Sequence, residues 1–348
     1  SIHVKNSADV KMTHRYSVHG PICFIDSVNH KAYAVRAAWM EPGGAPYLAS
    51  LRIDQATDWE SFREACSYSH IPGENMIWAD KKGNIGWQVV GIVPIRKNFS
   101  GYVPIPGDGR YEWSGYLPIK ERAHILNPSK NFFATANQHV TPDTYEHWDA
   151  VGYTWADPYR GDRINAVLNE KNNISLEDMG QLQTDYFSIP ASTLTPLLSK
   201  IKFEDSFTNA AKQFLMNWNF KLDKNSIAAG IYVAWEKQIT FNAQKYFVPE
   251  AIQPWINLQL TTIINRLENP INYFGVSAVE AEQKRNTFLK NAFEQATKNL
   301  KNKLGSEISA WNYGQEKYKH IYFEHPLANL VSPALKSKLN IGPLPRGG

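Results

Sequence analysis

Cysteine, long apolar runs and a clear excess of one charge are all missing from this sequence, and each absence excludes a class of protein. Its 348 residues include 2 Cys, 21 Gly and 20 Pro. Two cysteines cannot make the scaffold of a disulfide-rich domain, and collagen-like or low-complexity chains need far more glycine and proline. Every long apolar run is cut by Lys, Arg, Asp or Pro before the roughly 18 residues that span a bilayer. We therefore expect a globular chain with a sizeable core and no membrane span.

Charge is nearly balanced, because 37 basic and 33 acidic residues give a net charge of +4. The densest basic group has helical spacing and comprises Arg285, Lys290, Lys298, Lys301 and Lys303. Such a group is either a solvated helix face or a nucleic-acid groove, and the dispersion of the other basic residues favours the solvated face. We therefore predict no nucleic-acid partner.

The chain up to about residue 155 has the pattern of strands joined by turns. Residues 11–18 alternate, and residues 32–39 form a mostly apolar run. Residues 76–79 and 85–93 are rich in β-forming side chains and flank a polar turn in which Gly83 can take a positive φ. These last two segments predict a hairpin.

Helical signals begin inside the strand-rich part and dominate after about residue 160. Thr57 and Glu60 have capping-box spacing, and the apolar face that follows favours Cys66 as a buried small hydrophobe over a nucleophile. Ser175 and Asp178 have the same capping spacing. Further helices are expected over residues 206–219, 226–237, 249–267 and 278–304. The predicted fold class is α+β.

Local catalytic motifs are absent from the sequence. It contains no HExxH, CxxC, Walker loop or GxSxG elbow, and residues 106–109 form a turn rather than a dinucleotide fingerprint. Aromatic residues make up 13% of the chain. They pack in cores, and such an excess also suits a pocket that accepts an apolar group. Motifs alone thus indicate no more than an α+β protein with an aromatic-rich pocket.

Asn75 is the most informative single residue, because it immediately precedes the first hairpin strand. A sheet can aim its side-chain amide, and a carboxamide N–H is a suitable oxyanion donor because it is partly positive and keeps its proton. The alternative is a turn residue that bonds its own backbone. Arg96, after Pro94-Ile95, either reaches the same rim or lies in an exposed loop.

Several short segments occur in a fixed order along nearly the whole chain. They are His19-Gly-Pro21, Asn75-Met-Ile-Trp-Ala-Asp80-Lys-Lys-Gly83-Asn-Ile-Gly86, Val93-Pro-Ile-Arg96, Pro104-Ile-Pro-Gly107, Tyr111-Glu-Trp-Ser-Gly115, Thr135-Ala-Asn-Gln138, Trp155-Ala-Asp-Pro-Tyr-Arg160-Gly-Asp-Arg163-Ile164, Trp218-Asn219, His325-Pro-Leu327 and Gly347-Gly348. In this order and spacing, the set resembles the penicillin acylase family of N-terminal nucleophile hydrolases.

The resemblance implies an acylase mechanism. In this family a precursor cleaves itself to expose an N-terminal Ser, whose hydroxyl attacks an amide carbonyl while its own α-amine acts as base. The resemblance makes Asn75 the side-chain donor to the oxyanion. Arg96 matches the arginine beside the nucleophile, where its charge helps to keep the amine unprotonated.

Other matching residues are expected to be structural. His19 is interpreted as a satisfied imidazole in a strand, and Arg160 and Arg163 as residues that fix their loop to the sheet. Trp78, Trp87 and Trp155 either wall an acyl pocket or pack in the core.

The two ends depart from the family pattern. Ser1-Ile2-His3-Val4 does not match the nucleophile strand, and His19 follows Ser1 too closely. We therefore expect Ser1 not to be the nucleophile. We also expect the chain to be an internal β-chain fragment, inactive alone, whose partners are an α-chain and a nucleophile segment of the same precursor.

The resemblance also sets the remaining expectations. The fold is part of an αββα sandwich with a helical region, divided into a sheet-rich part (1–160), a mainly helical part (161–310) and a return segment (311–348). The small-molecule substrate is an N-acyl compound of the β-lactam, homoserine lactone or lipopeptide type, which would link the enzyme to antibiotic biosynthesis, and the location is the periplasm or outside the cell. Catalysis requires no cofactor, a structural Ca²⁺ can accompany the complete protein, and Asp80 is interpreted as a turn residue. The alternative is a non-catalytic ligand-binding domain on the same scaffold.

Overall fold

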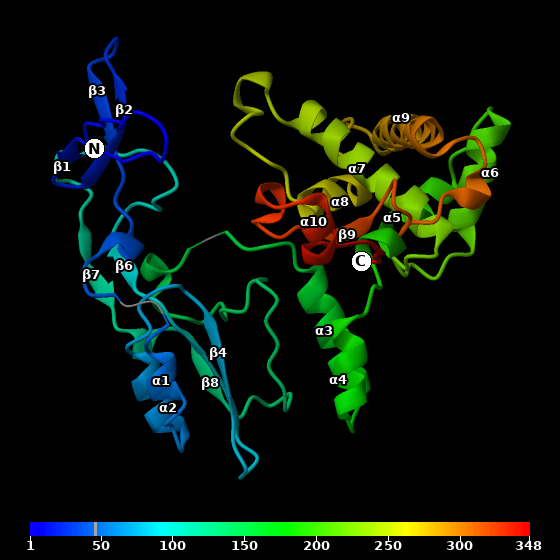
Figure 1. The fold of residues 1–348 in the computed structure, drawn as a ribbon. Coiled ribbons are helices and arrows are strands. Elements are labelled where there is room, and N and C mark those ends of the chain that lie inside the picture. The colour runs from blue at the N-terminus through cyan, green and yellow to red at the C-terminus, as the bar shows by residue number, and fades with distance from the viewer. Residues whose placement is uncertain (45–46, 153) are drawn as a thin grey trace. The chain divides into compact units, whose positions relative to one another are not determined.

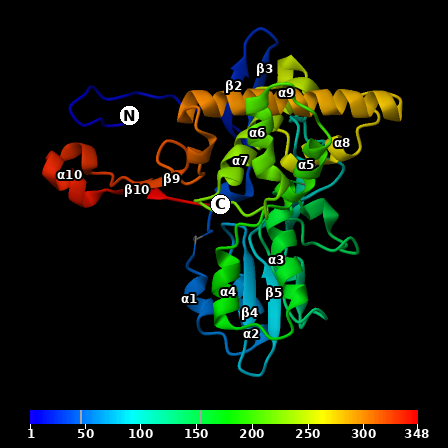
Figure 2. The ribbon, with the colours of Figure 1, turned by 90° about the vertical axis from the view of Figure 1, so that its right-hand side faces the viewer.

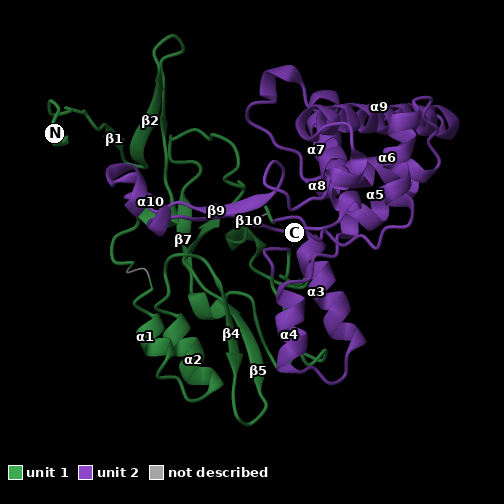
Figure 3. Cartoon of the chain, turned by 45° about the vertical axis from the view of Figure 1, so that its right-hand side comes forward, with its two compact units in different colours: residues 1–135, 139–155 green, residues 136–138, 156–348 purple. Residues whose placement is uncertain are grey.

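The computed structural model describes residues 1–44, 47–152 and 154–348. Helices and strands are mixed, which confirms the α+β class. The chain forms two compact units (Figure 3), of which unit 1 comprises Ser1–Thr135 and His139–Trp155, and unit 2 comprises Ala136–Gln138 and Ala156–Gly348. The division into three parts expected from the sequence stays a prediction.

In its described residues, unit 1 contains short antiparallel sheets and two α-helices. Its elements are β1 (Tyr16–Ser17), β2 (Gly20–Asp26), β3 (Lys31–Ala34), α1 (Ser50–Ile53), α2 (Trp59–Cys66), β4 (Asn75–Ala79), β5 (Ile85–Val89), β6 (Val93–Arg96), β7 (Trp113–Leu117) and β8 (His124–Leu126). The strand orders are β1-β2-β3, β4-β5-β8 and β6-β7. Helix α2 packs against β4 and β5 (Figure 1).

The predicted hairpin is confirmed as β4 and β5, which pair antiparallel. Its turn is held by Asp80, whose Oδ1 accepts hydrogen bonds from the backbone N–H groups of Lys82 (2.8 Å) and Asn84 (2.9 Å). The second strand is shorter than predicted, since β5 ends at Val89. Gly91 then takes a φ of +98°, which redirects the chain so that β6 pairs with β7 instead.

The early strands are also shorter than the sequence pattern indicates. Of residues 11–18 only Tyr16 and Ser17 lie in a strand, and β3 ends at Ala34. Alternation makes a strand only where a partner strand is available, and near the N-terminus Ile2 and Val10 form a single isolated bridge.

The first helix begins one residue later than its predicted cap. Asp58, not Thr57, is the N-cap: its Oδ1 accepts from the N–H of Ser61 at 2.8 Å, and the Ser61 hydroxyl accepts from the N–H of Asp58 at 3.2 Å. The reciprocal pair satisfies two backbone donors. At the other end of α2, Cys66 is fully buried, as predicted.

Unit 2 is mainly helical. Its elements are α3 (Tyr159–Glu170), α4 (Leu176–Gln183), α5 (Ile189–Ser199), α6 (Ser206–Met216), α7 (Ile227–Phe247), α8 (Leu260–Glu268), α9 (Ala278–Leu304), β9 (His320–Phe323), α10 (Pro333–Leu339) and β10 (Ile341–Pro345). The capping box of Ser175 and Asp178 and the helix over 278–304 are confirmed.

One helix prediction is wrong over half of its length. Residues 249–259 form a short turn and a loop, and α8 begins only at Leu260. Pro249 and Pro254 lack the N–H that a helix interior requires. The loop is tied to α7 instead, because the Gln244 amide donates to the carbonyl of Gln253 at 3.3 Å and accepts from the N–H of Leu258 at 3.1 Å.

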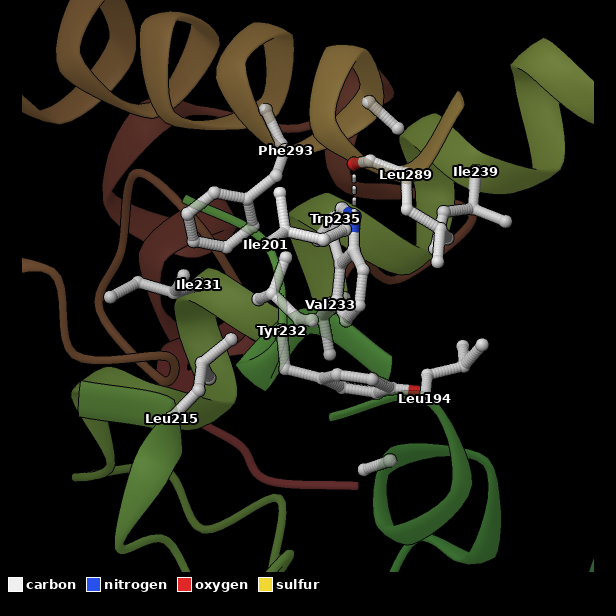
Figure 4. Packing of buried hydrophobic residues seen from close by; sticks show 14 of the residues in the cluster. Leu194, Ile201, Leu215, Ile231, Tyr232, Val233, Trp235, Ile239, Leu289 and Phe293 are labelled. Carbon is white, nitrogen blue, oxygen red and sulfur yellow. Dashed lines mark hydrogen bonds between the residues drawn. The ribbon is translucent and has the colours of Figure 1, made fainter. Parts of the chain in front are cut away.

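The main core lies between α7 and α9, which pack against each other (Figure 2). Trp235 of α7 is fully buried beside Phe293 of α9 (Figure 4). The Trp235 indole N–H donates to the carbonyl of Leu289 at 3.3 Å. Burying such large aromatic and aliphatic side chains is the principal source of stability in a globular unit.

Candidate active site

The Asn75 side chain is held in one orientation by Trp87. Asn75 is the first residue of β4, and its Oδ1 accepts from the Trp87 indole N–H at 2.7 Å. An indole nitrogen is a donor only, so it must bond the carbonyl oxygen of the amide. Among the described residues, the Nδ2 group of Asn75 has no hydrogen-bond partner. Its two N–H groups are therefore available to an acceptor outside the described chain.

Trp87 is itself fixed by the packing of the hairpin. It is 2% exposed and stacks on Phe133, with ring centroids 4.4 Å apart. On the other face of the sheet, Trp78 packs against Phe62 of α2 at 5.2 Å between centroids. Trp78 and Trp87 thus pack in the core, which was one of the two roles considered for them, and together they make the strand that carries Asn75 rigid.

Arg96 lies at the end of β6, on the wall of a cavity of about 450 Å³. The cavity is lined by Arg96, Asn98, Phe99, Ser100, Trp148, Asp149 and Val151. Partial burial lowers the pKa of Arg96 from its ordinary value, and its guanidinium carbon lies 5.9 Å from the ring centroid of Trp113. Asn75 does not line this cavity, so the structure does not bring the two predicted residues to one described pocket.

Trp148, one of the residues that line this cavity, belongs to a cluster of aromatic side chains. The ring of His139 stacks on Trp155 at 4.0 Å and meets Trp148 edge-on at 5.7 Å between centroids. Trp155 therefore contacts another aromatic ring of unit 1, and the choice between its two predicted roles stays open. The cavity thus has an apolar surface, formed by the Trp148 ring, and a cationic one, formed by Arg96. This combination suits a ligand that has an apolar part and a part that binds a cation.

Arg160, which was expected to fix its loop to the sheet, lies in α3 and instead holds the loop segment that contains a second carboxamide, that of Asn137. Its Nη2 donates to the carbonyl of Ala136 at 2.8 Å and to the Oδ1 of Asn137 at 2.7 Å. Asn137 has a φ of +68°, in the left-handed region that Asn enters more readily than most other L-residues. Its Nδ2 has no hydrogen-bond partner in the part of the chain that the structure describes.

The other two expected structural residues differ in detail from the prediction. Arg163 forms an ion pair with Asp185 at 2.6 Å, so it joins two parts of the helical unit rather than a loop and a sheet. His19 lies in the turn between β1 and β2 rather than within a strand. Its imidazole is satisfied, as expected, because Nε2 bonds the Glu112 carboxylate at 2.6 Å.

Asn137 is the functional candidate that sequence reasoning passed over. It lies in the segment Thr135–Gln138, which contributes to the family resemblance, but no local pattern indicates a role for it. One feature singles it out, the bond between its side-chain oxygen and an arginine 23 residues away. This bond cannot be read from local sequence, because a turn Asn and a solvated Asn look the same there.

Within residues 1–44, 47–152 and 154–348, no group of three or more His, Cys, Asp or Glu side chains is placed to hold a metal ion. No helix there has the length and apolar character needed to cross a bilayer. No calcium ligand set can therefore be assigned within the described part of the chain.

Comparison with known proteins places these residues in a family. The family model described as penicillin amidase matches residues 1–348. The chain belongs to the penicillin amidase family. Its fold agrees: a solved structure of the thermostable penicillin G acylase from Alcaligenes faecalis superimposes with a TM-score of 0.70 at 22% identity. That match covers 89% of this chain and 61% of the solved one, and it shows an N-terminal nucleophile hydrolase fold.

Curated relatives include two kinds of acylase. Penicillin acylase 2 proenzyme from Pseudomonas sp. (strain SE83) is 25% identical over 69% of this chain and 31% of its own length. The acyl-homoserine lactone acylase QuiP from Pseudomonas aeruginosa is 26% identical over 79% of this chain and 36% of its own length. The chain thus spans about a third of the length of these relatives.

Proposed function

We propose that the complete protein is an amidohydrolase that cleaves a linear amide and releases an acyl group. Membership of the penicillin amidase family supports this proposal, as do the acylase relatives. The amine released would belong to a β-lactam, a homoserine lactone or a lipopeptide, the classes that the family resemblance suggests. The nucleophile would be a Ser exposed by cleavage of a precursor, outside the residues of this chain.

The observation that carries the proposal is the hydrogen bond from Trp87 that already occupies the side-chain oxygen of Asn75. When a nucleophile adds to an amide carbonyl, negative charge develops on the carbonyl oxygen, and preorganised N–H donors stabilise it. Trp87 occupies the oxygen of Asn75 and so directs the two N–H groups outward. Because the donor is fixed before substrate arrives, no reorganisation is needed in the transition state.

Asn137 is a second candidate for the same task. Its oxygen is bonded by the guanidinium of Arg160 rather than by a neutral indole. A cation at the oxygen polarises the amide and makes its N–H groups stronger donors. The two asparagines lie in different units, so each is proposed as a donor in its own right and tested separately.

The test is an assay of the full-length protein and its variants against a panel of N-acyl substrates. Loss of an oxyanion donor typically lowers kcat by about 100-fold or more. We expect such a loss for Asn75→Ala, or for Asn137→Ala if that residue is the donor. Asn172→Ala, an exposed loop change, is the matched control. If neither variant loses more than about tenfold in kcat, both donors are excluded.

The remaining features of the complete protein follow from the same family. We propose a precursor that is processed, in line with the word proenzyme in the name of one relative. We also propose a periplasmic or extracellular location and a structural Ca²⁺ in the complete protein. Mass spectrometry of the mature protein and calcium analysis after dialysis would test the processing and the ion.

A further inference from the structure

A groove between α7 and α9 is lined almost entirely by carboxamides. Its volume is about 590 Å³, and its lining residues are Gln238, Phe241, Asn242, Asn291, Gln295 and Asn299. The α7 residues follow a spacing of i, i+3 and i+4, and the α9 residues follow i, i+4 and i+8, so each set forms one row on its helix. No charged residue belongs to the lining, although α9 is rich in Lys and Glu.

Four of the five amides form one directed chain of hydrogen bonds. Gln295 donates to Asn299 at 2.8 Å, Asn299 donates across the groove to Gln238 at 3.5 Å, and Gln238 donates to Asn242 at 2.9 Å. Each oxygen that accepts is fixed by its neighbour, and such chains polarise their members. The side chains are therefore held in place before any ligand arrives.

The directed chain leaves unused groups at both ends. Among the described residues, the Nδ2 of Asn242 and the Oε1 of Gln295 have no hydrogen-bond partner, and the whole amide of Asn291 is unbonded. The two ends of the hydrogen-bond chain thus offer donors, on Asn242, and an acceptor, on Gln295, and Asn291 adds a complete carboxamide to the lining.

Phe241 adds an apolar surface to this polar lining. Its side chain is 54% exposed although it is aromatic. The ammonium of Lys245 lies 4.2 Å from the ring centroid. An exposed ring next to neutral amides is an arrangement that can contact a molecule having both C–H and O–H faces.

We infer that this groove binds a neutral saccharide of one or two rings. Each sugar hydroxyl both donates and accepts, as does each carboxamide, so neighbouring hydroxyls can match the unused groups. The apolar C–H face of a sugar ring would lie on Phe241. The volume lies within the range of about 300–1,000 Å³ that is typical of small-molecule sites.

Other ligand classes fit the groove less well. An anion or a nucleic acid would need Lys or Arg in the lining, whereas the Lys245 ammonium beside the groove lies over the Phe241 ring and is not part of the lining. A folded protein partner would bury about 800 Å² on each side around an apolar centre, whereas this groove has a single apolar side chain. The uncharged lining therefore favours the saccharide.

The experiment is a calorimetric titration of the whole chain with glucose, maltose, cellobiose and diacetylchitobiose. We expect saturable binding of at least one sugar with a Kd of about 1 mM. Gln295→Leu and Phe241→Ala should each weaken that binding about tenfold or more, since each removes a contacting group. The matched control is Gln181→Leu, the same change on the exposed surface of α4, which should bind like the parent.

Three results would overturn the inference. The first is that none of the four sugars shows saturable binding up to about 20 mM. The second is that the parent and both groove variants bind the sugar with the same Kd. The third is that Gln181→Leu weakens binding as much as the groove variants do. Circular dichroism is measured for every variant. Should Phe241→Ala unfold, Asn291→Ser takes its place, because Asn291 is exposed and unbonded among the described residues.

Discussion

At the scale of the residue, the orientation of Asn75 depends on a single donor. The indole N–H of Trp87 occupies the amide oxygen, and Trp87 is held by its stacking on Phe133. A free carboxamide can rotate by half a turn and present its oxygen instead, which would repel an oxyanion. The proposed chemistry therefore requires Trp87 to position Asn75, although Trp87 would not touch the substrate.

Replacing Trp87 by Phe tests this positioning role. Trp87→Phe keeps an aromatic ring against Phe133 but removes the N–H, so the Asn75 amide loses its orientation. If Asn75 is the oxyanion donor, we expect kcat of the full-length enzyme to fall by about tenfold with little change in KM, because the contact is made in the transition state. Trp255→Phe, at a position 84% exposed, is the control. A fall in both variants, or a change in KM alone, would contradict the positioning role.

The two cysteines provide a second prediction at this scale. Burial raises the pKa of the Cys66 thiol to about 12, whereas Cys23 is exposed. Because the thiolate is the reactive form, a thiol reagent at pH 8 should label Cys23 quickly and leave Cys66 unmodified until the chain is unfolded. Peptide mapping after brief labelling, with and without urea, checks this outcome. Labelling of Cys66 in the native protein would show that α2 opens readily.

At the scale of the element, a glycine in α3 allows the Asn137 segment to pack. A Cβ at Gly161 would lie 2.4 Å from the Cδ of Gln138. Gln138 in turn accepts from the N–H of Ala136 at 2.6 Å, so its side chain helps to hold the residues on either side of Asn137. Helix α3 thus sets both the Arg160 contact and the space for Gln138.

Two glycine substitutions separate this packing from helix propensity. Gly161→Ala should lower the free energy of unfolding, because the methyl group displaces Gln138. Gly180→Ala in α4 meets no atom within 4 Å and should raise it by about 0.5–1 kcal/mol, the usual gain in a helix interior. Urea denaturation of both variants measures the difference. A gain for Gly161→Ala would mean that Gln138 moves away at no cost.

Elements with strong local signals were predictable, and elements fixed by distant partners were not. The helix over 278–304 has an uninterrupted apolar period and a Ser277 cap, and its bounds agree with the structure. The segment 249–267 has a similar composition, but its two prolines and the Gln244 bonds keep half of it out of a helix. Likewise β3 ends at Ala34, where its pairing with β2 ends, although the apolar run continues.

In the candidate site, too, local features could be predicted and distant contacts could not. The position of Asn75 at the start of a strand could be predicted from the sequence, because a hairpin is a local structure. Its bond to Trp87 depends on strand register, and the bond of Asn137 to Arg160 joins residues 23 positions apart. The family resemblance assigned roles to Asn75 and Arg96, which hydrophobic periodicity cannot do. The hydrogen bond from Arg160 adds Asn137 as a further candidate.

At the scale of the whole molecule, the apolar core is concentrated in the helical unit. The larger buried cluster contains residues of α5–α9 and the segment that follows α9, whereas the smaller cluster in unit 1 centres on Phe62, Cys66, Val90 and Ile119. A change that weakens the larger cluster should therefore lower the stability of the protein more than a change in the smaller one. A change of pH can act in this way, because a carboxyl group packs beside the larger cluster.

Glu236 of α7 is this carboxyl group, and it makes stability fall as pH rises. Burial raises its pKa above the ordinary value of 4.5, and nearby Asp157 acts in the same direction, whereas the Tyr232 hydroxyl and Lys237 oppose the shift. Between its unfolded and folded pKa values the folded chain binds more protons than the unfolded chain, so the free energy of unfolding decreases with pH. Each pH unit between the two values costs about 1.4 kcal/mol.

Glu236→Gln removes this titration while keeping the size of the side chain. The variant should match the parent near pH 4, where the carboxyl is mostly protonated in both states, and should be the more stable of the two above the folded pKa. Urea denaturation at pH 4, 5, 6, 7 and 8 measures the difference, with the exposed Glu170→Gln as control. A constant offset at every pH would mean that the bond between Tyr232 and Glu236, not the buried charge, determines the effect.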